Sequence, residues 1–357
     1  MTLIIAEAGV NHNGDEALAL KLIDEAHRAG ADIVKFQTFK SDKLVNASAT
    51  QAEYQVRNTQ KQESQLDMLR RLELSYASHE KLLAHANALG IEFLSTAFDS
   101  ESLHFLVNEL GLKRLKVPSG ELTNTPLLLE HAQTDCELIL STGMASLGEV
   151  EEALAVIAFG SICGKDTPPS REAFLKAYFS EAGQQALKNR LTLLHCTTEY
   201  PTPVEDVNLK AMDTLASSFG LPVGYSDHTA GIHVPIAAVA RGAVLIEKHF
   251  TLDKQLPGPD HKASLEPGEL RDMIKGIRDI EIALGGGIKA PKPSEIKNKA
   301  IARKSLVASA TIKQGDLFTT DNLTVMRPGS GIEPKYFWQY LGKAAVKSYS
   351  LGQLIDE

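Results

Sequence analysis

Cysteine is scarce in this chain, and its few positions lie far apart. The 357 residues include three cysteines, Cys136, Cys163 and Cys196, and these form no CxxC pattern. This usage argues against a disulfide framework and against a structural zinc site. It favours a reduced, cytoplasmic protein.

The chain also lacks long runs of apolar residues and long runs of basic residues. No segment approaches the roughly 18 continuous apolar residues that a membrane helix needs. Residues 1–14 (MTLIIAEAGVNHNG) have no basic segment and their apolar run breaks at Glu7, so we expect no signal peptide. The formal net charge is −8 and no long basic run occurs, which argues against nucleic acid or a membrane surface as a partner.

Short apolar runs alternate with amphipathic, helix-like stretches, several of which end in Gly. Eight such units in about 250 residues predict a (β/α)8 barrel. A doubly wound open sheet is the alternative, disfavoured because no GxGxxG follows the first run. The expected strands are 3–10, 32–38, 92–98, 114–120, 137–143, 191–197, 222–228 and 243–250.

Three segments interrupt or follow this alternation. Residues 40–68, which are Gln-rich, and 161–188, which contain Pro-Pro, indicate insertions on the barrel. Residues 288–295 (IKAPKPSE) predict a Pro-bearing linker. We therefore expect a barrel domain over 1–287 and a small, mostly β domain over 296–357.

Polar residues recur where the expected strands finish. In a parallel barrel these ends share one face, which carries the activity of barrel enzymes. The series predicts an active site there, and it comprises Glu7, Lys35, Gln37, Ser95, Thr96, Lys116, Ser119, Ser141, Thr142, Thr197, Asp227, His228, Lys248 and His249.

Two lysines late in strands point to an anionic ligand. Lys35 and Lys116 would be costly to bury without an anion. The neighbouring strand ends STAF (95–98), VPSGE (117–121) and STGM (141–144) supply hydroxyls and glycines that suit phosphate. The alternative is turn chemistry with lysines that reach to solvent.

Two histidines end consecutive strands, and neighbouring strands lie about 4.8 Å apart. His228 and His249 could therefore share one divalent ion that polarises a carbonyl. His12, in NHNG (11–14), is a candidate third ligand or substrate contact. Three carboxylates, Glu7, Glu121 and Asp260, are candidates for proton handling or polyol binding, with helix capping as the plain alternative.

The motifs that carry these residues occur in a recognisable order, and they resemble the N-acetylneuraminate (sialic acid) synthases and their legionaminic and pseudaminic acid relatives. The resemblance covers nearly the whole chain. It rests on IAEAGVNHNG, VKFQTFK, LSTAFD, KVPSGE, STGM, LHCTTEYPTP, GYSDHT, EKHFTLD with PGPDH, and RPGSGI. It implies a (β/α)8 barrel followed by an antifreeze-like SAF domain.

The resemblance also implies a reaction, a C–C bond-forming transfer. Phosphoenolpyruvate condenses with the open-chain aldehyde of an N-acylated mannosamine, and phosphate is released by C–O cleavage. N-acetylmannosamine is the first expectation for the sugar. The alternatives are 2,4-diacetamido-2,4,6-trideoxymannose, as in a legionaminic acid synthase, or a metal-dependent aldolase or epimerase. A carbohydrate- or ice-binding protein is a non-enzyme alternative that leaves the polar strand ends unexplained.

The resemblance assigns roles to individual residues. His228 and His249 hold Mn²⁺ or Mg²⁺, Glu7 handles a proton, and Lys116 and Glu121 complete the catalytic set. The phosphoenolpyruvate site comprises Lys35, Thr96, Lys116, Ser119, Ser141 and Ser226, and the sugar site comprises Gln37, Glu121, Tyr200, Asp260 and Arg327.

Arg327 matches an arginine that the SAF domain delivers into the neighbouring subunit's barrel, which implies a domain-swapped homodimer.

One departure from the family pattern concerns Thr198, where related sialic acid synthases often carry Asn. Thr lacks the amide, and this weakens the assignment to N-acetylmannosamine relative to the diacetamido sugar.

Overall fold

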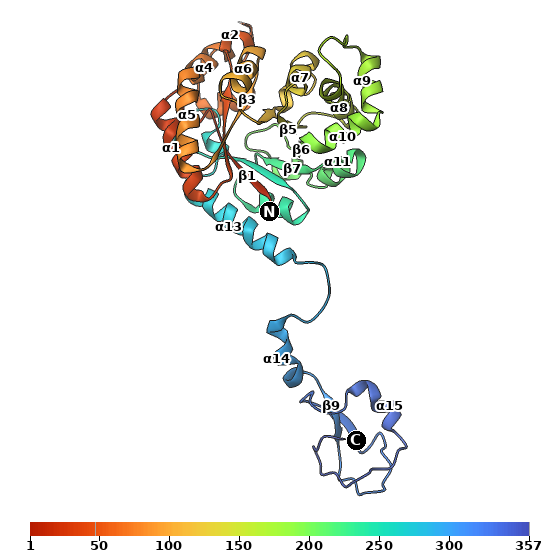
Figure 1. The fold of residues 1–357 in the computed structure, drawn as a ribbon. Helices are drawn as coiled ribbons and strands as arrows, with labels where there is room; N and C mark the ends of the chain where they lie inside the picture. The colour runs from red at the N-terminus through yellow and green to blue at the C-terminus, as the bar shows by residue number, and fades with distance from the viewer. Residues whose placement is uncertain (47, 357) are drawn as a thin grey trace. The chain divides into compact units, whose positions relative to one another are not determined.

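Eight parallel strands close into a barrel in sequence order, β1 to β8, as the alternation predicted (Figure 1). The computed structural model describes residues 1–46 and 48–356. The strands are β1 Leu3–Gly9, β2 Ile33–Thr38, β3 Glu92–Ala97, β4 Arg114–Val117, β5 Glu137–Ser141, β6 Leu191–His195, β7 Val223–Asp227 and β8 Leu245–His249.

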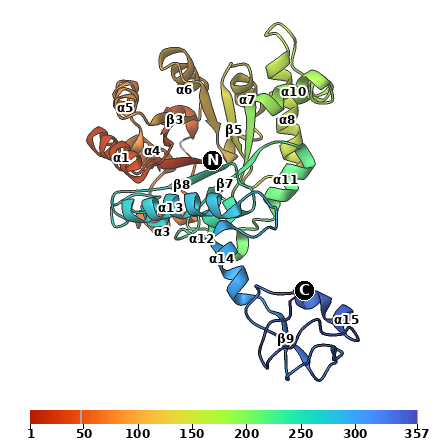
Figure 2. The ribbon, with the colours of Figure 1, turned by 60° about the horizontal axis from the view of Figure 1, so that its bottom comes forward.

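Helices surround the strands (Figure 2). They are α1 Glu16–Ala29, α2 Ser41–Leu44, α3 Glu53–Thr59, α4 Gln65–Leu72, α5 Tyr76–Leu89, α6 Ser100–His104, α7 Thr125–Ala132, α8 Leu147–Ile162, α9 Arg171–Tyr178, α10 Glu181–Arg190, α11 Ala211–Phe219, α12 His233–Ala240 and α13 Pro267–Leu284. In the described residues, no helix is both long and apolar enough to cross a membrane.

Capping residues in the sequence explain where most helices begin and end. The Asp15 side chain accepts hydrogen bonds from Ala17 N and Leu18 N, which caps α1. Gly30 ends α1 in the left-handed conformation, with φ 87°. Helix α8 continues past Gly160 to Ile162, and a Cβ at Gly160 would lie 2.5 Å from the Cβ of Ala132. Gly160 thus serves the close approach of α7 and α8.

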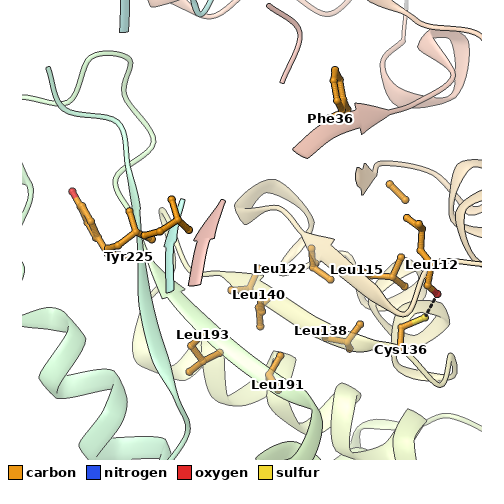
Figure 3. Packing of buried hydrophobic residues seen from close by; sticks show 14 of the residues in the cluster. Phe36, Leu112, Leu115, Leu122, Cys136, Leu138, Leu140, Leu191, Leu193 and Tyr225 are labelled. Carbon is orange, nitrogen blue, oxygen red and sulfur yellow. Dashed lines mark hydrogen bonds between the residues drawn. The ribbon is translucent and has the colours of Figure 1, made fainter. Parts of the chain in front are cut away.

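Alternation along the strands builds two apolar layers. Outward side chains such as Leu115, Leu138 and Leu193 pack between strands and helices (Figure 3). Inward side chains form a second cluster that fills the barrel, and it comprises Ile5, Ile33, Leu94, Ile139, Leu194 and Leu245. The next inward positions along the strands carry the polar side chains of the site, so this cluster is their floor.

Both expected insertions fold. The segment around 40–68 forms α2, α3 and α4, and 161–188 forms most of α9 and α10, which pack on α8.

The chain divides into two compact units, Met1–Gly285 and Gly286–Glu357. In the second unit, helix α14 (Pro293–Ala302) begins inside the stretch expected to be a linker.

The second unit has its own core. Strands β9 (Ser305–Ala308) and β10 (Leu323–Met326) pair antiparallel, and the short helix α15 spans Phe337–Tyr340. The core comprises Leu306, Ala308, Ile312, Phe318, Leu323, Ala345, Tyr349 and Ile355. The fold class, a barrel followed by a small β unit, is as predicted.

Candidate functional site

A cavity of about 310 Å³ opens at the carboxyl ends of the eight strands. Each strand, or the loop after it, contributes to its lining. The barrel residues to which the resemblance gave catalytic or binding roles all line it, namely Glu7, Lys35, Gln37, Thr96, Lys116, Ser119, Glu121, Ser141, Tyr200, Ser226, His228, His249 and Asp260. Of the wider series at the strand ends, Ser95, Thr142 and Thr197 are not among the described residues that line it. Arg327 lies in the second unit, where its Nε donates to the carbonyl of Ala302.

Two lysines and two carboxylates meet at the floor of the cavity. The Nζ of Lys35 lies 2.8 Å from Glu7 Oε2 and 3.5 Å from Glu247 Oε2. The Nζ of Lys116 lies 3.6 Å from Glu247 Oε1, which also accepts a 2.7 Å hydrogen bond from Ser226 Oγ. All four charged side chains are buried. The cluster is balanced in charge, with two ammonium groups facing two carboxylates.

Burial and pairing act differently on these groups. Burial raises the pKa of Glu7 to about 7, against the opposing effect of Lys35. Burial alone would raise the pKa of Glu247, but Lys116 and Lys35 outweigh it and hold this pKa well below its usual range. Burial lowers the pKa of Lys116 despite Glu247. Lys116 is therefore the cation that an incoming anion would stabilise most.

Hydroxyl groups surround the lysines. Thr96 Oγ1 accepts a 3.2 Å hydrogen bond from Lys35 Nζ. Ser119 Oγ accepts from the backbone N of Gly143 at 3.0 Å and lies 3.2 Å from Cys196 Sγ. A Cβ at Gly143 would come within 2.8 Å of Ser119 Oγ, so only glycine allows this approach. The arrangement gives an anion two ammonium groups and several hydroxyls.

The two predicted metal ligands face each other across β7 and β8. The ring centroids of His228 and His249 are 5.7 Å apart. Nδ1 of His228 donates to the carbonyl of Thr197 at 2.6 Å, so this nitrogen holds the proton and Nε2 keeps its lone pair. Burial lowers the pKa of His228 to about 4 and that of His249 well below its ordinary value. Both rings are therefore neutral near pH 7.

Neutral imidazoles suit a divalent cation. Nδ1 of His249 is buried without a hydrogen-bond partner among the described residues. Across residues 1–46 and 48–356 no cluster of three or more His, Cys, Asp or Glu side chains could hold a metal. The unpartnered Nδ1 of His249 and the lone pair on Nε2 of His228 fit an ion held by two nitrogens, whose other positions would be open to water and substrate oxygens.

The outer part of the cavity carries aromatic and carboxyl groups. The Tyr200 ring centroid lies 4.2 Å from that of His228 and 5.0 Å from that of Tyr54. Burial raises the pKa of Asp260 to about 6. Glu121 accepts a 2.6 Å hydrogen bond from Asn124 Nδ2. These groups offer a ring face and polar atoms to a polyol.

Known proteins share this arrangement of domains. Residues 22–289 match the NeuB family and 303–356 match the SAF domain. The chain belongs to the NeuB family.

Relatives of known activity agree with this assignment. The chain is 52% identical to the N,N'-diacetyllegionaminic acid synthase of Campylobacter jejuni, over 100% of this chain and 99% of that protein. It is 47% identical to the enzyme of the same name from Legionella pneumophila, over 98% of this chain and 92% of that protein. The crystal structure of N-acetylneuraminic acid (sialic acid) synthetase from Leptospira borgpetersenii superposes with a TM-score of 0.67 at 34% identity, covering 83% of this chain and 90% of that one. The NeuB-family chain is a sialic-acid-type synthase, as its motifs predicted.

Two expectations about strand-end residues needed correction in this NeuB-family barrel. Asp227 and Lys248, counted in the series on the active face, point outward and form an ion pair with each other. His12 is not among the described residues that line the cavity, and its Nδ1 accepts from Gly14 N. Alternation explains the outward pair, since neighbouring residues in a strand face opposite sides.

Sequence reasoning missed Glu247 and the wall built by Ser41–Leu72. Glu247 could have been found by alternation, because it shares a face with His249 two residues later. The wall consists of Leu44, Val45, Tyr54, Gln55, Gln65, Met68, Leu69 and Leu72. Two of its helices, α2 and α3, span only four and seven residues, too short for a clear helical period.

Proposed function

We propose that this synthase condenses phosphoenolpyruvate with 2,4-diacetamido-2,4,6-trideoxymannose and water, giving N,N'-diacetyllegionaminic acid and phosphate in the cytoplasm. The observation that carries the reaction type is one cavity in which Lys35 and Lys116 face the neutral His228 and His249. The lysines suit the anionic reactant and the imidazoles suit an ion beside the aldehyde.

The choice of sugar rests on the relatives and on the cavity wall. Both synthases with 47% identity or more are named for the diacetamido product. Leu44, Val45, Met68, Leu69 and Leu72 give the wall an apolar surface. A 6-deoxy sugar presents a methyl group where N-acetylmannosamine presents a hydroxymethyl group, and apolar surface favours the methyl. N-acetylmannosamine, the first expectation from sequence, becomes the second candidate.

The proposed roles follow the geometry. Phosphoenolpyruvate is held by Lys35, Lys116 and the hydroxyls of Thr96, Ser119, Ser141 and Ser226. Its C3 attacks the aldehyde carbon, water adds to C2, and the C–O bond to phosphate breaks. Glu7, with a pKa of about 7, takes at its carboxylate one proton of the attacking water and returns it to the former aldehyde oxygen, which becomes a hydroxyl, while the second water proton leaves with phosphate. Gln37, Glu121, Tyr200 and Asp260 orient the sugar.

His228 and His249 would hold the divalent ion, Mn²⁺ or Mg²⁺. When bound, such an ion supplies Lewis-acid polarisation of the aldehyde carbonyl. The hydrogen bond from His228 Nδ1 to Thr197 keeps the Nε2 lone pair available at every turnover. We also propose a swapped homodimer in which 1–287 is the catalytic domain and 296–357 carries Arg327 to the N-acyl group in the partner's barrel.

The test measures phosphate release from phosphoenolpyruvate with each sugar in turn and identifies products by mass spectrometry. We expect a higher kcat/KM with the diacetamido sugar than with N-acetylmannosamine. The reverse order would assign the chain to N-acetylneuraminate synthesis. No phosphate with either sugar would refute the synthase and favour an aldolase or epimerase.

A further inference from the structure

A buried network lies behind the two histidines, on the outer side of the barrel wall. Lys248 Nζ lies 2.6 Å from Asp227 Oδ2, and both side chains are 0% exposed. The two residues are paired in register across β7 and β8. Neither is among the described residues that line the cavity, so no substrate role accounts for them.

The network holds the chain on both sides of His228. Asp227 Oδ1 accepts from Tyr225 Oη at 3.1 Å and from Thr229 N at 3.0 Å. Asp227 Oδ2 also accepts from Thr229 Oγ1 at 3.1 Å. Lys248 Nζ donates in addition to the carbonyl of Thr229. The Lys248 side chain of β8 thus contacts both the residue before His228 and the residue after it.

That same side chain belongs to the residue directly before His249. The positions of the two imidazoles are therefore linked through the contacts of Lys248. His228 has a further anchor in Thr197, whereas Nδ1 of His249 has no hydrogen-bond partner in the described part of the chain. The placement of the His249 ring depends accordingly on its backbone, which Lys248 ties to β7.

Stability alone does not explain such a pair. Removing two charges from water costs several kcal/mol per ion, and apolar residues of similar volume often stabilise a fold equally well. A metal site with two protein ligands, in contrast, needs a fixed spacing between them, because partners behind the ligands set their orientation.

We propose that Asp227 and Lys248 form a positioning pair that sets the spacing of His228 and His249 for a divalent ion. This inference rests on the two-histidine metal site of the proposed function. It assigns Tyr225 and Thr229 a supporting role, since both donate to the Asp227 carboxylate.

The experiment removes both charges together, in Asp227→Asn/Lys248→Met, so that neither is left unpaired. Mn²⁺ affinity of metal-stripped, full-length protein is measured by calorimetry without phosphoenolpyruvate, and folding by circular dichroism. We expect Mn²⁺ binding to weaken about tenfold, the lower end of the effect of partners behind metal ligands. A folded double variant that binds Mn²⁺ within threefold of wild type overturns the proposal.

Three controls separate the outcomes. Arg114 bridges Glu92 and Glu137 at the opposite end of the strands, so Arg114→Met should lower stability and leave Mn²⁺ affinity unchanged. If His228→Ala binds Mn²⁺ as wild type does, the metal site itself is refuted, and the positioning role with it. If the double variant does not fold, the Mn²⁺ affinity of Asp227→Asn is measured instead. A value within threefold of wild type then overturns the proposal.

Discussion

The ammonium group of Lys35 lies 2.8 Å from the carboxylate of Glu7 on the neighbouring strand, and both side chains are buried. Lys35 also reaches Glu247 and Thr96, so it is the most connected cation of the cavity floor. A phosphoenolpyruvate molecule that binds here meets a lysine already neutralised by carboxylates. Lys116, held by one carboxylate at 3.6 Å, is freer to respond to the ligand.

This difference predicts unequal stability losses in Lys35→Met and Lys116→Met. Loss of Lys35 removes the ion pair with Glu7 at 2.8 Å and one with Glu247, whereas loss of Lys116 removes only a 3.6 Å contact with Glu247. Breaking a buried pair costs about 3–5 kcal/mol. Lys116→Met should cost clearly less, while both variants lose phosphoenolpyruvate affinity. Urea unfolding monitored by circular dichroism measures the two values. Lys81→Met on the surface of α5 is the control, and equal losses at Lys35 and Lys116 would contradict this ranking.

Loss of either histidine should abolish the metal dependence. His228→Ala and His249→Ala are expected to lower phosphate release more than about 100-fold, since even partners behind metal ligands contribute about 10–100-fold. Their melting temperatures should stay near that of wild type. His27→Ala, exposed on α1, is the matched control. Full activity of EDTA-stripped wild-type enzyme would count against the metal site.

Asp260 should make stability depend on pH. Burial raises its folded pKa to about 6 from an ordinary value of 3.8, so stability is lost as the pH rises through this interval. Asp260→Asn has no charge to bury and should gain up to about 3 kcal/mol over wild type at pH 8 and nothing near pH 3. Thermal unfolding across this range measures the difference. The exposed Asp272→Asn should show none, and a pH-independent gain at 260 would argue against burial as the cause.

Tyr54 should contribute to sugar binding through its ring. Its centroid lies 5.0 Å from that of Tyr200, and aromatic pairs of this kind contribute about 0.5–1.5 kcal/mol beyond burial. Because we propose that Tyr200 orients the sugar, Tyr54→Ala, which removes the ring packed against Tyr200, should raise the KM of the sugar about three- to tenfold and leave that of phosphoenolpyruvate nearly unchanged. Tyr54→Phe, which keeps the ring, should resemble wild type. An equal rise in the KM of the sugar and the KM of phosphoenolpyruvate would contradict a selective role of Tyr54 in sugar binding.

Arg327→Ala tests the subunit swap. A hydrogen bond to a charged group contributes about 1.5–3 kcal/mol, so the KM of the sugar should rise about tenfold or more and that of phosphoenolpyruvate much less. Arg303→Ala, an exposed arginine in the same unit, is the control. Mixing Arg327→Ala with an inactive His228→Ala protein should restore activity in heterodimers. Failure of that complementation would refute delivery of Arg327 to a partner.

The barrel and the inner face of its strands were predictable because each rests on a local pattern. Alternation separates Ser226 and His228 from Asp227, and the same rule would have placed Glu247 beside His249. Partners across strands were not predictable, since the contacts of Lys35 with Glu7 and Glu247 depend on register. The wall from α2 to α4 was not predicted because its contacts join residues far apart in the sequence, such as the 2.7 Å hydrogen bond that Asn58 donates to the carbonyl of Pro259.

The folded insertion after β2 has an evolutionary consequence. The charged groups that we propose to act on phosphoenolpyruvate lie on strands, where a change of register would disturb the whole barrel. The apolar wall beside the proposed sugar site sits on three short helices that the barrel can lose or exchange without breaking a strand pair. The proposed preference for the methyl group of a 6-deoxy sugar is thus encoded in a different stretch of the chain from the strand residues proposed to act on phosphoenolpyruvate, so the two can vary separately.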